Sequence, residues 1–107
     1  MYTVTITKPA EADLNAIVNY YTMVLKASIA ADNLIDIIEE KLLFLATAPF
    51  TYEIEHDEYL QRKGIRSVLV KNYFIFYTIT EKIKKVTILR ILYARRNWLQ
   101  LFTNEEN

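Results

Sequence analysis

The spacing of apolar residues changes along this chain, and each change marks a different kind of element. From Tyr2 to Thr7, apolar and polar side chains alternate and β-branched residues dominate, which predicts a strand. Thr7 followed by Pro9 supplies the start of a helix. Spacings of three and four residues predict one apolar stripe on this helix, with Asp13 off the stripe and facing water. The stripe consists of Leu14, Ile17, Tyr21 and Val24.

A second helix is predicted from Ser28 to Ala46, and Pro49 follows its end. The short link around Lys26 and Ala27 makes the two helices a hairpin. Most carboxylates of the second helix lie off its apolar stripe, so we expect them on the solvent side. The stripe consists of Leu34, Ile37, Ile38, Leu42 and Leu45.

Strand patterns dominate the second half, after a charged connector at residues 50–63 with at most a short strand or turn. Two strands are predicted at Gly64–Val70 and Tyr73–Thr80. Lys71 and Asn72 join them in a tight two-residue turn, because Asn tolerates a positive φ. A polar loop then precedes the last elements, which are a strand at Val86–Tyr93 and a short helical tail ending near Phe102.

The order of these elements is β-α-α-β-β-β with a short C-terminal helix, which predicts a single α+β domain over residues 1–107. The helical hairpin should pack on one face of a mostly antiparallel sheet. A chain of this length cannot cover the other face completely, so we expect that face to be open to a partner.

The amino-acid composition excludes several kinds of site. The absence of cysteine excludes disulfides, thiolate metal sites and thiol nucleophiles. The single histidine, His56, argues against a multi-histidine metal site, and no residue cluster implies a metal or an organic cofactor. No run approaches the roughly 18 apolar residues of a membrane span, and the N-terminus lacks the pattern of a secretory signal. We therefore expect a cytoplasmic protein that does not enter a membrane.

The formal net charge of zero hides an acidic half and a basic half. Residues 1–59 carry three lysines against ten carboxylates, a net charge of −7, and residues 60–107 carry ten Lys and Arg against three Glu, a net charge of +7. A basic surface on a sheet would suit phosphate or an acidic protein segment; the alternative is an ordinary solvated face. Four basic residues flank or occupy predicted strands: Arg66, Lys71, Arg90 and Arg96.

Four local patterns recur here in a characteristic order. They are the first-helix segment Ala12–Tyr20, the helix end with Leu42, Leu45 and Pro49, the hairpin segments Gly64–Arg66 and Val70–Tyr77, and the last-strand segment Ile88–Trp98. With this order and spacing the chain resembles, over nearly its whole length, the RelE/ParE family of bacterial type II toxin–antitoxin toxins.

The resemblance implies a toxin that a partner antitoxin neutralises, and it leaves the activity open, because fold does not decide function. RelE-like members are ribosome-dependent endoribonucleases that cut messenger RNA in the A site. ParE-like members inhibit DNA gyrase and have no known nuclease activity. A third alternative is a relic that binds an antitoxin but has lost toxicity. Whether the chain is an enzyme therefore stays open.

A nuclease of the RelE type must activate the ribose 2′-OH, stabilise charge on the phosphate and protonate the leaving oxygen. Tyr93 stands where relatives often carry a His beside the arginines, and its ordinary pKa of about 10 makes it a poorer base at neutral pH. The catalytic candidates for this alternative are Arg66, Lys71, Tyr77, Arg90, Tyr93 and Arg96, with Arg95 and His56 as further sources of charge or a proton.

Two departures from the RelE-like pattern argue against the nuclease interpretation. RelE-like nucleases commonly have an Arg directly after the Tyr of the central hairpin strand, whereas Phe74 follows Tyr73 here. They are also strongly basic, as suits docking into ribosomal RNA, whereas this chain is neutral. The ending Arg96–Trp98 looks more like the ParE pattern of Arg, a short polar residue and Trp, so the resemblance favours gyrase inhibition.

The same resemblance implies contacts with a cognate antitoxin. Antitoxins of this class wrap an acidic, amphipathic segment around the toxin, which would meet the basic half. Operator DNA would be reached only through the antitoxin. Trp98 and Phe102 also fit a tail packed against the sheet. The residues expected to contact the target or the antitoxin are Arg66, Lys71, Arg90, Arg95, Arg96 and Trp98.

Overall fold

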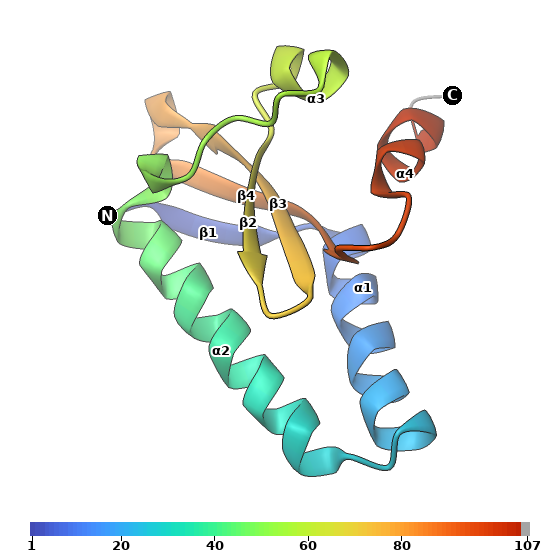
Figure 1. Cartoon of the computed structure of the whole chain (residues 1–107). Coiled ribbons are helices and arrows are strands. Elements are labelled where there is room, and N and C mark those ends of the chain that lie inside the picture. Colours follow the sequence, from blue (N-terminus) through green and yellow to red (C-terminus); the bar gives the residue numbers. More distant parts are fainter. Residues whose placement is uncertain (106–107) are drawn as a thin grey trace.

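Figure 1 shows the computed structural model, which describes residues 1–105 as two long helices and two short ones around a four-stranded sheet. The predicted order of strands and long helices is confirmed. The elements are β1 (Thr3–Ile6), α1 (Lys8–Asn19), η1 (Tyr20–Val24), α2 (Ser28–Thr47), η2 (Pro49–Thr51), α3 (Glu58–Arg62), β2 (Arg66–Val70), β3 (Tyr73–Thr80), η3 (Glu81–Ile83), β4 (Lys85–Tyr93) and α4 (Trp98–Glu105).

The sheet has the strand order β1-β4-β3-β2. β4 pairs antiparallel with β3, and β3 with β2, whereas β1 pairs parallel with β4. The hairpin of β2 and β3 and the long connection from β1 through both helices explain this mixture, because a parallel neighbour requires a crossover. The predicted α+β fold with a mostly antiparallel sheet is thus confirmed.

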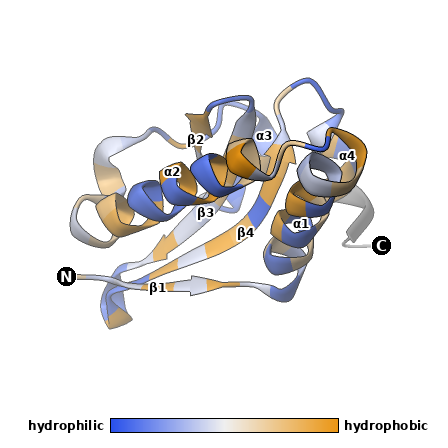
Figure 2. Cartoon of the chain, turned by 90° about the horizontal axis from the view of Figure 1, so that it is seen from below, coloured by the Kyte–Doolittle hydropathy of each residue, from blue (hydrophilic) through white to orange (hydrophobic). Residues whose placement is uncertain are grey.

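The helical hairpin covers one face of the sheet, as Figure 2 shows from below. The α2 stripe meets the strands through Leu34, Ile38 and Leu45, all nearly or fully buried. From β3, Ile75 and Tyr77 point to the same side, because residues two apart share a face. This layer is the main core of the protein.

The opposite face of the sheet is covered in part by α3 and α4, whereas Leu69 of β2 stays 55% exposed on that side. The expectation that the chain leaves this face incompletely covered is therefore confirmed. Phe76 is fully buried there under α4, and its ring centroid lies 4.9 Å from that of Phe102 and 5.1 Å from that of Trp98. Leu60 of α3 is buried in the same cluster. The aromatic residues of β3 and of the C-terminal tail are numerous enough to form this second, smaller core.

The first helix ends differently from its prediction. After Asn19 the chain continues as the π-helical segment η1, which has more residues per turn than an α-helix. Thr22 donates its hydroxyl hydrogen to the Val18 carbonyl at 3.0 Å, a contact that perturbs helices. The predicted apolar stripe therefore loses its spacing at its last position, and Val24 is 64% exposed.

Two loops also depart from their predictions. In the β2–β3 turn the left-handed residue is Lys71, with a φ of 56°, and not Asn72. The connector contains the short helix α3, capped by the Asp57 side chain, which accepts from the Leu60 N–H at 3.1 Å. Within residues 1–105, no helix has both the length and the apolar character that crossing a membrane requires.

Candidate functional site

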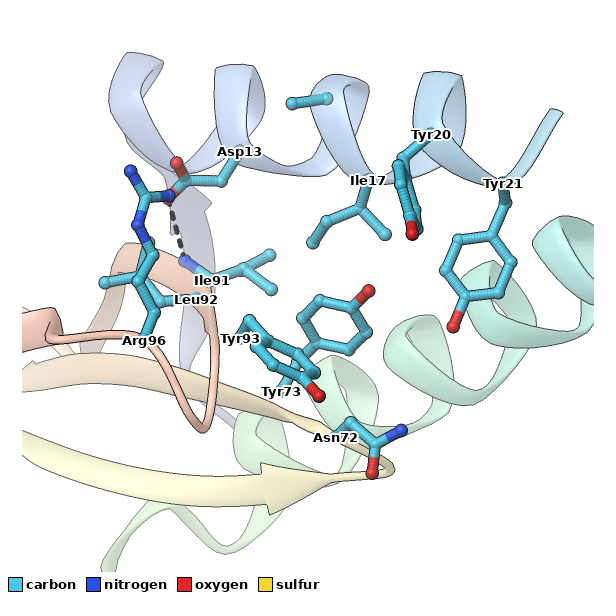
Figure 3. Close-up of a pocket in the computed structure, with 11 residues that line it drawn as sticks. Asp13, Ile17, Tyr20, Tyr21, Asn72, Tyr73, Ile91, Leu92, Tyr93 and Arg96 are labelled. Atoms are coloured by element: carbon cyan, nitrogen blue, oxygen red, sulfur yellow. Dashed lines mark hydrogen bonds between the residues drawn. The ribbon is translucent and has the colours of Figure 1, made fainter. Parts of the chain in front are cut away.

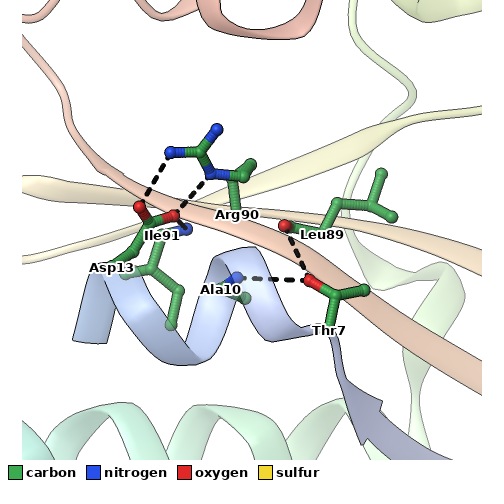
Figure 4. A network of polar contacts seen from close by, with 6 residues as sticks. All are labelled: Thr7, Ala10, Asp13, Leu89, Arg90 and Ile91. Atoms are coloured by element: carbon green, nitrogen blue, oxygen red, sulfur yellow. Dashed lines mark hydrogen bonds and ion pairs between the residues drawn. The ribbon is translucent and has the colours of Figure 1, made fainter. Parts of the chain in front are cut away.

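An ion pair fixes the first helix against the last strand (Figure 4). Arg90 of β4 donates from Nε to Asp13 Oδ2 at 2.7 Å and from Nη2 to Oδ1 at 2.8 Å, and the Ile91 N–H donates to Oδ2 at 3.0 Å. Both side chains are nearly buried, at 12% and 11% exposure. Asp13 therefore does not face water as predicted, because a cation in the middle of β4 requires a charged acceptor.

The start of α1 is also attached to β4, which positions Asp13 for this ion pair. Thr7 caps α1 by accepting a hydrogen bond from the Ala10 N–H at 3.2 Å, and its hydroxyl donates to the Leu89 carbonyl at 3.0 Å. One residue thus joins the start of α1 to β4, and Asp13 follows less than two turns later. Of the residues in this network, Asp13 and Ile91 line a cleft.

The cleft has a volume of ≈ 480 Å³ and lies between α1–η1 and the ends of β3 and β4 (Figure 3). Ile17 and Ile91 give it an apolar floor. Tyr20 and Tyr21 project from the helical side toward two tyrosines of the sheet. The residues that line it are Asp13, Ala16, Ile17, Tyr20, Tyr21, Asn72, Tyr73, Ile91, Leu92, Tyr93 and Arg96.

The tyrosines of the cleft contact one another. The pKa of Tyr73 is raised to about 12, mainly by burial and in the same direction by a hydrogen bond with Tyr21 and by the nearby Tyr93 and Tyr20. The Tyr73 and Tyr93 ring centroids lie 5.8 Å apart in an edge-to-face arrangement. Tyr73 is therefore a neutral phenol at physiological pH and not a base.

The charge of the cleft comes from Arg96. Both oxygens of Asp13 already accept hydrogen bonds from β4, so that its charge is balanced by Arg90. Arg96 is exposed on the loop after β4, and its backbone N–H donates to the Tyr93 carbonyl at 3.0 Å. Tyrosine hydroxyls beside one arginine suit an anionic group attached to an apolar body.

A second group of sequence candidates lies near the other end of β3. Tyr77 is fully buried and donates its hydroxyl to the Pro49 carbonyl at 2.8 Å. Burial raises its pKa to about 12, although the neighbouring Arg66 acts in the opposite direction. Arg66 donates to the Tyr52 carbonyl and stacks over Phe50, with 5.1 Å between its Cζ and the ring centroid. These contacts make both residues structural.

The remaining candidates are spread over the surface. Lys71 lines a neighbouring cleft of ≈ 540 Å³ that shares Tyr21 and Asn72 with the first. Arg95 is exposed beside Arg96, and His56 is exposed in the connector near Glu53. Trp98 is half-buried against the aromatic rings of β3, which confirms the predicted packing of the tail.

The structure thus brings only Tyr93 and Arg96 of the nuclease candidates into one cleft. Sequence reasoning missed Asp13 and the tyrosines of the helical side. Asp13 had a usable signal, since an arginine inside an apolar strand needs an acceptor from a neighbouring element. Tyr20 had none, because its direction depends on the π-helical turn.

The comparisons with known proteins agree with this fold. The sequence model of one family, described as the ParE toxin of the type II toxin–antitoxin system parDE, matches residues 4–98. No curated protein gives a significant match to the sequence.

Solved structures of toxin–antitoxin systems share the architecture. The chromosomal ParDE system from P. aeruginosa aligns with a TM-score of 0.71 and 22% identity, over 89% of this chain and 98% of that chain. The RelBE2 complex from Mycobacterium tuberculosis aligns with a TM-score of 0.53 and 21% identity, over 86% of this chain and 96% of that chain. The intact E. coli RelBE complex aligns with a TM-score of 0.60 and 11% identity, over 90% of this chain and 100% of that chain. At these identities the likeness concerns the fold.

Proposed function

Because the chain belongs to the ParE family of toxins from type II toxin–antitoxin systems, we propose that it arrests bacterial growth by binding and inhibiting DNA gyrase in the cytoplasm. In this proposal the protein acts through a surface and catalyses no reaction. The observation that carries the proposal is that several residues predicted as candidates for RNA cleavage are held by contacts within the chain.

An RNA-cleaving centre needs cations and proton carriers that converge on one phosphate. In this chain Arg90 is held by Asp13 at 2.7 Å, and Tyr77 is fully buried with its hydroxyl on the Pro49 carbonyl. Arg66 is held by the Tyr52 carbonyl. These engagements support a binding role over a catalytic one.

The part of the sheet face that lies under α4 supports the same conclusion. Phe74 stands where the nuclease pattern has an arginine, and it packs near Phe76 and Trp98, with ring centroids 5.7 and 6.3 Å away. A face filled by aromatic side chains under α4 offers little electrostatic stabilisation to a phosphate. The surface that stays available for a target is the tyrosine-lined cleft with Arg96, together with the exposed Arg95 and Lys71.

We further propose a cognate antitoxin as partner, in keeping with the solved toxin–antitoxin complexes of similar fold. An acidic, amphipathic segment would place carboxylates on Arg96 and Lys71 and apolar side chains in the clefts between them. Operator DNA would be bound through that antitoxin.

The test compares two targets in one culture. The chain is expressed in a bacterium without antitoxin, and thymidine and methionine incorporation are followed together. Early loss of thymidine incorporation is expected. An early collapse of methionine incorporation, with discrete cuts inside the codons of translated messages, would instead identify a ribosome-dependent nuclease. Unimpaired growth would identify a relic without toxicity.

Purified components give the direct measurement. The chain should inhibit supercoiling by gyrase, and Arg96→Ala should weaken this inhibition roughly tenfold or more if Arg96 lies at the centre of the contact. Arg62→Ala is the matched control, because Arg62 is an exposed arginine on α3 and lines none of the clefts. Equal inhibition by both variants would remove Arg96 from the target surface.

A further inference from the structure

The first strand leaves one edge of the sheet without a partner among residues 1–105. The N–H groups of Thr3 and Thr7 donate toward β4, to the carbonyls of Lys84 and Ile88 at 2.8 and 3.1 Å. Because alternate residues of a parallel pair face the same neighbour, the backbone groups of Val4 and Ile6 point outward. In Figure 2, β1 lies at the lower edge of the sheet.

The two edges of the sheet differ in their protection. On the β2 side the connector covers the edge, since Ile54 bridges to Arg66 and the Glu55 N–H donates to the Ile65 carbonyl at 2.8 Å. β1 contains neither proline nor a charged residue between Thr3 and Ile6. Edge strands normally carry such features to prevent association, so the β1 edge is suited to pair with another strand.

An apolar groove accompanies this edge. It has a volume of ≈ 440 Å³ and lies between β1 and α2, where Val4, Ile6, Leu42 and Ala46 line it. Leu43 stands at its rim and is 71% exposed. A strand added to β1 would bury the open side of this groove as well as pair its backbone.

The charges at the two ends of the edge are opposite. Near the start of β1, the Tyr2 N–H donates to the Ala46 carbonyl, and Lys84 Nζ lies 5.2 Å from the centroid of the Tyr2 ring. Glu39 lines the groove about two helical turns before Ala46, away from that end. An edge with one basic and one acidic end is complementary to itself when two copies run antiparallel.

We propose that the chain forms a homodimer in which the β1 strands of two copies pair antiparallel about a twofold axis perpendicular to the sheet. This arrangement joins the two sheets into one and keeps the helices of both copies on the same side. The two grooves then face each other, so that Leu43 of each copy is covered by the other. Glu39 of each copy lies beside Lys84 of its partner.

The first test measures the mass of the free protein by sedimentation velocity and light scattering. A dimer of twice 12.6 kDa is expected at high concentration, with dissociation on dilution. Leu43→Glu should give a monomer at every concentration. The control Ile29→Glu changes an equally exposed residue on the helical hairpin, at 78% exposure, and should stay dimeric. A monomeric wild type, or a dimer that survives Leu43→Glu, overturns the proposal.

A charge exchange tests the orientation of the two copies. Glu39→Lys should weaken the dimer, and Glu39→Lys combined with Lys84→Glu should restore it. A double variant as weak as the single one contradicts the antiparallel pairing. A wild type that is monomeric alone and gains protection of the Val4 and Ile6 amides only in an antitoxin complex would assign the edge to the antitoxin. Growth arrest and gyrase inhibition are separate readouts, so failure of the dimer leaves the proposed function standing.

Discussion

Asp13 and Arg90 lie 77 positions apart in the sequence and form a two-point contact between α1 and β4. The carboxylate also accepts the Ile91 N–H at 3.0 Å, so that it binds both the side chain and the backbone of the strand. Arg90, in the middle of an apolar strand, is therefore bound by a carboxylate of its own chain. Its role is to fix the helical hairpin on the sheet, and thereby the walls of the cleft.

Replacing Asp13 by Asn should destabilise the protein strongly. The substitution keeps the shape of the side chain but leaves the charge of Arg90 nearly buried without its counter-charge, which costs about 2–4 kcal/mol. The free energy of unfolding from urea titrations measures the effect. The control Asp32→Asn, on the exposed side of α2, should change it by less than about 0.5 kcal/mol. Equal effects of the two substitutions would show that the ion pair contributes nothing particular.

Alkaline pH should destabilise the fold through two tyrosines. Burial raises the pKa of both Tyr73 and Tyr77 to about 12, whereas tyrosines of the unfolded chain titrate near about 10. A raised pKa means that the folded state binds the proton more tightly, so this contribution is complete below pH about 10 and is lost as the pH rises toward about 12.

Absorbance of the phenolate measures this titration directly. Tyr73 and Tyr77 should ionise late in the native protein, and all eight tyrosines should ionise together in urea. Tyr77→Phe should remove one late group and also cost about 1–2 kcal/mol, because the Pro49 carbonyl loses its donor. Tyr2→Phe serves as the control, because Tyr2 is not among the groups that raise the pKa of Tyr73 or Tyr77. A native protein in which all tyrosines titrate together would contradict the expectation.

The sequence predicts the main elements because their periodicities are strong. The strand around Val4 and the apolar stripe of α2 required no tertiary information, and both are confirmed. The Thr7 cap was also readable, since its chemistry is local. These features are decided within a few residues, where spacing and side-chain type suffice.

The errors concern features that depend on distant parts of the chain. Val24 is exposed because a π-helical turn interrupts the helix, and Asp13 is nearly buried because Arg90 lies across from it. The part of the opposite sheet face around Phe76 is covered because the tail folds back over it. Local patterns cannot contain these facts. The cleft depends on all of them, so its tyrosines could not be assigned to a site from the sequence.

The β2–β3 turn offers a test of backbone strain. Lys71 adopts a φ of 56°, a region in which a side chain costs about 1 kcal/mol or more and glycine costs nothing. Lys71→Gly should therefore leave the free energy of unfolding unchanged or raise it slightly. Lys82→Gly, at an exposed lysine without a positive φ, should lower it by about 0.5–1 kcal/mol. If both substitutions destabilise the protein equally, the turn does not store strain.

The attachment of α4 to the sheet rests on Phe102, which is 6% exposed and packs edge-to-face on Phe76. Phe102→Ala should cost about 3 kcal/mol if the site cannot collapse, and it should loosen α4 before the main core. The single tryptophan, Trp98, reports this change because it begins α4. Its fluorescence should shift to longer wavelength in the variant without denaturant, while circular dichroism stays near that of the wild type.

The control Leu69→Ala alters a side chain that is 55% exposed on β2 and should leave the emission unchanged. An unshifted emission in Phe102→Ala would mean that Trp98 holds α4 on the sheet by its own contacts with Phe74 and Phe76.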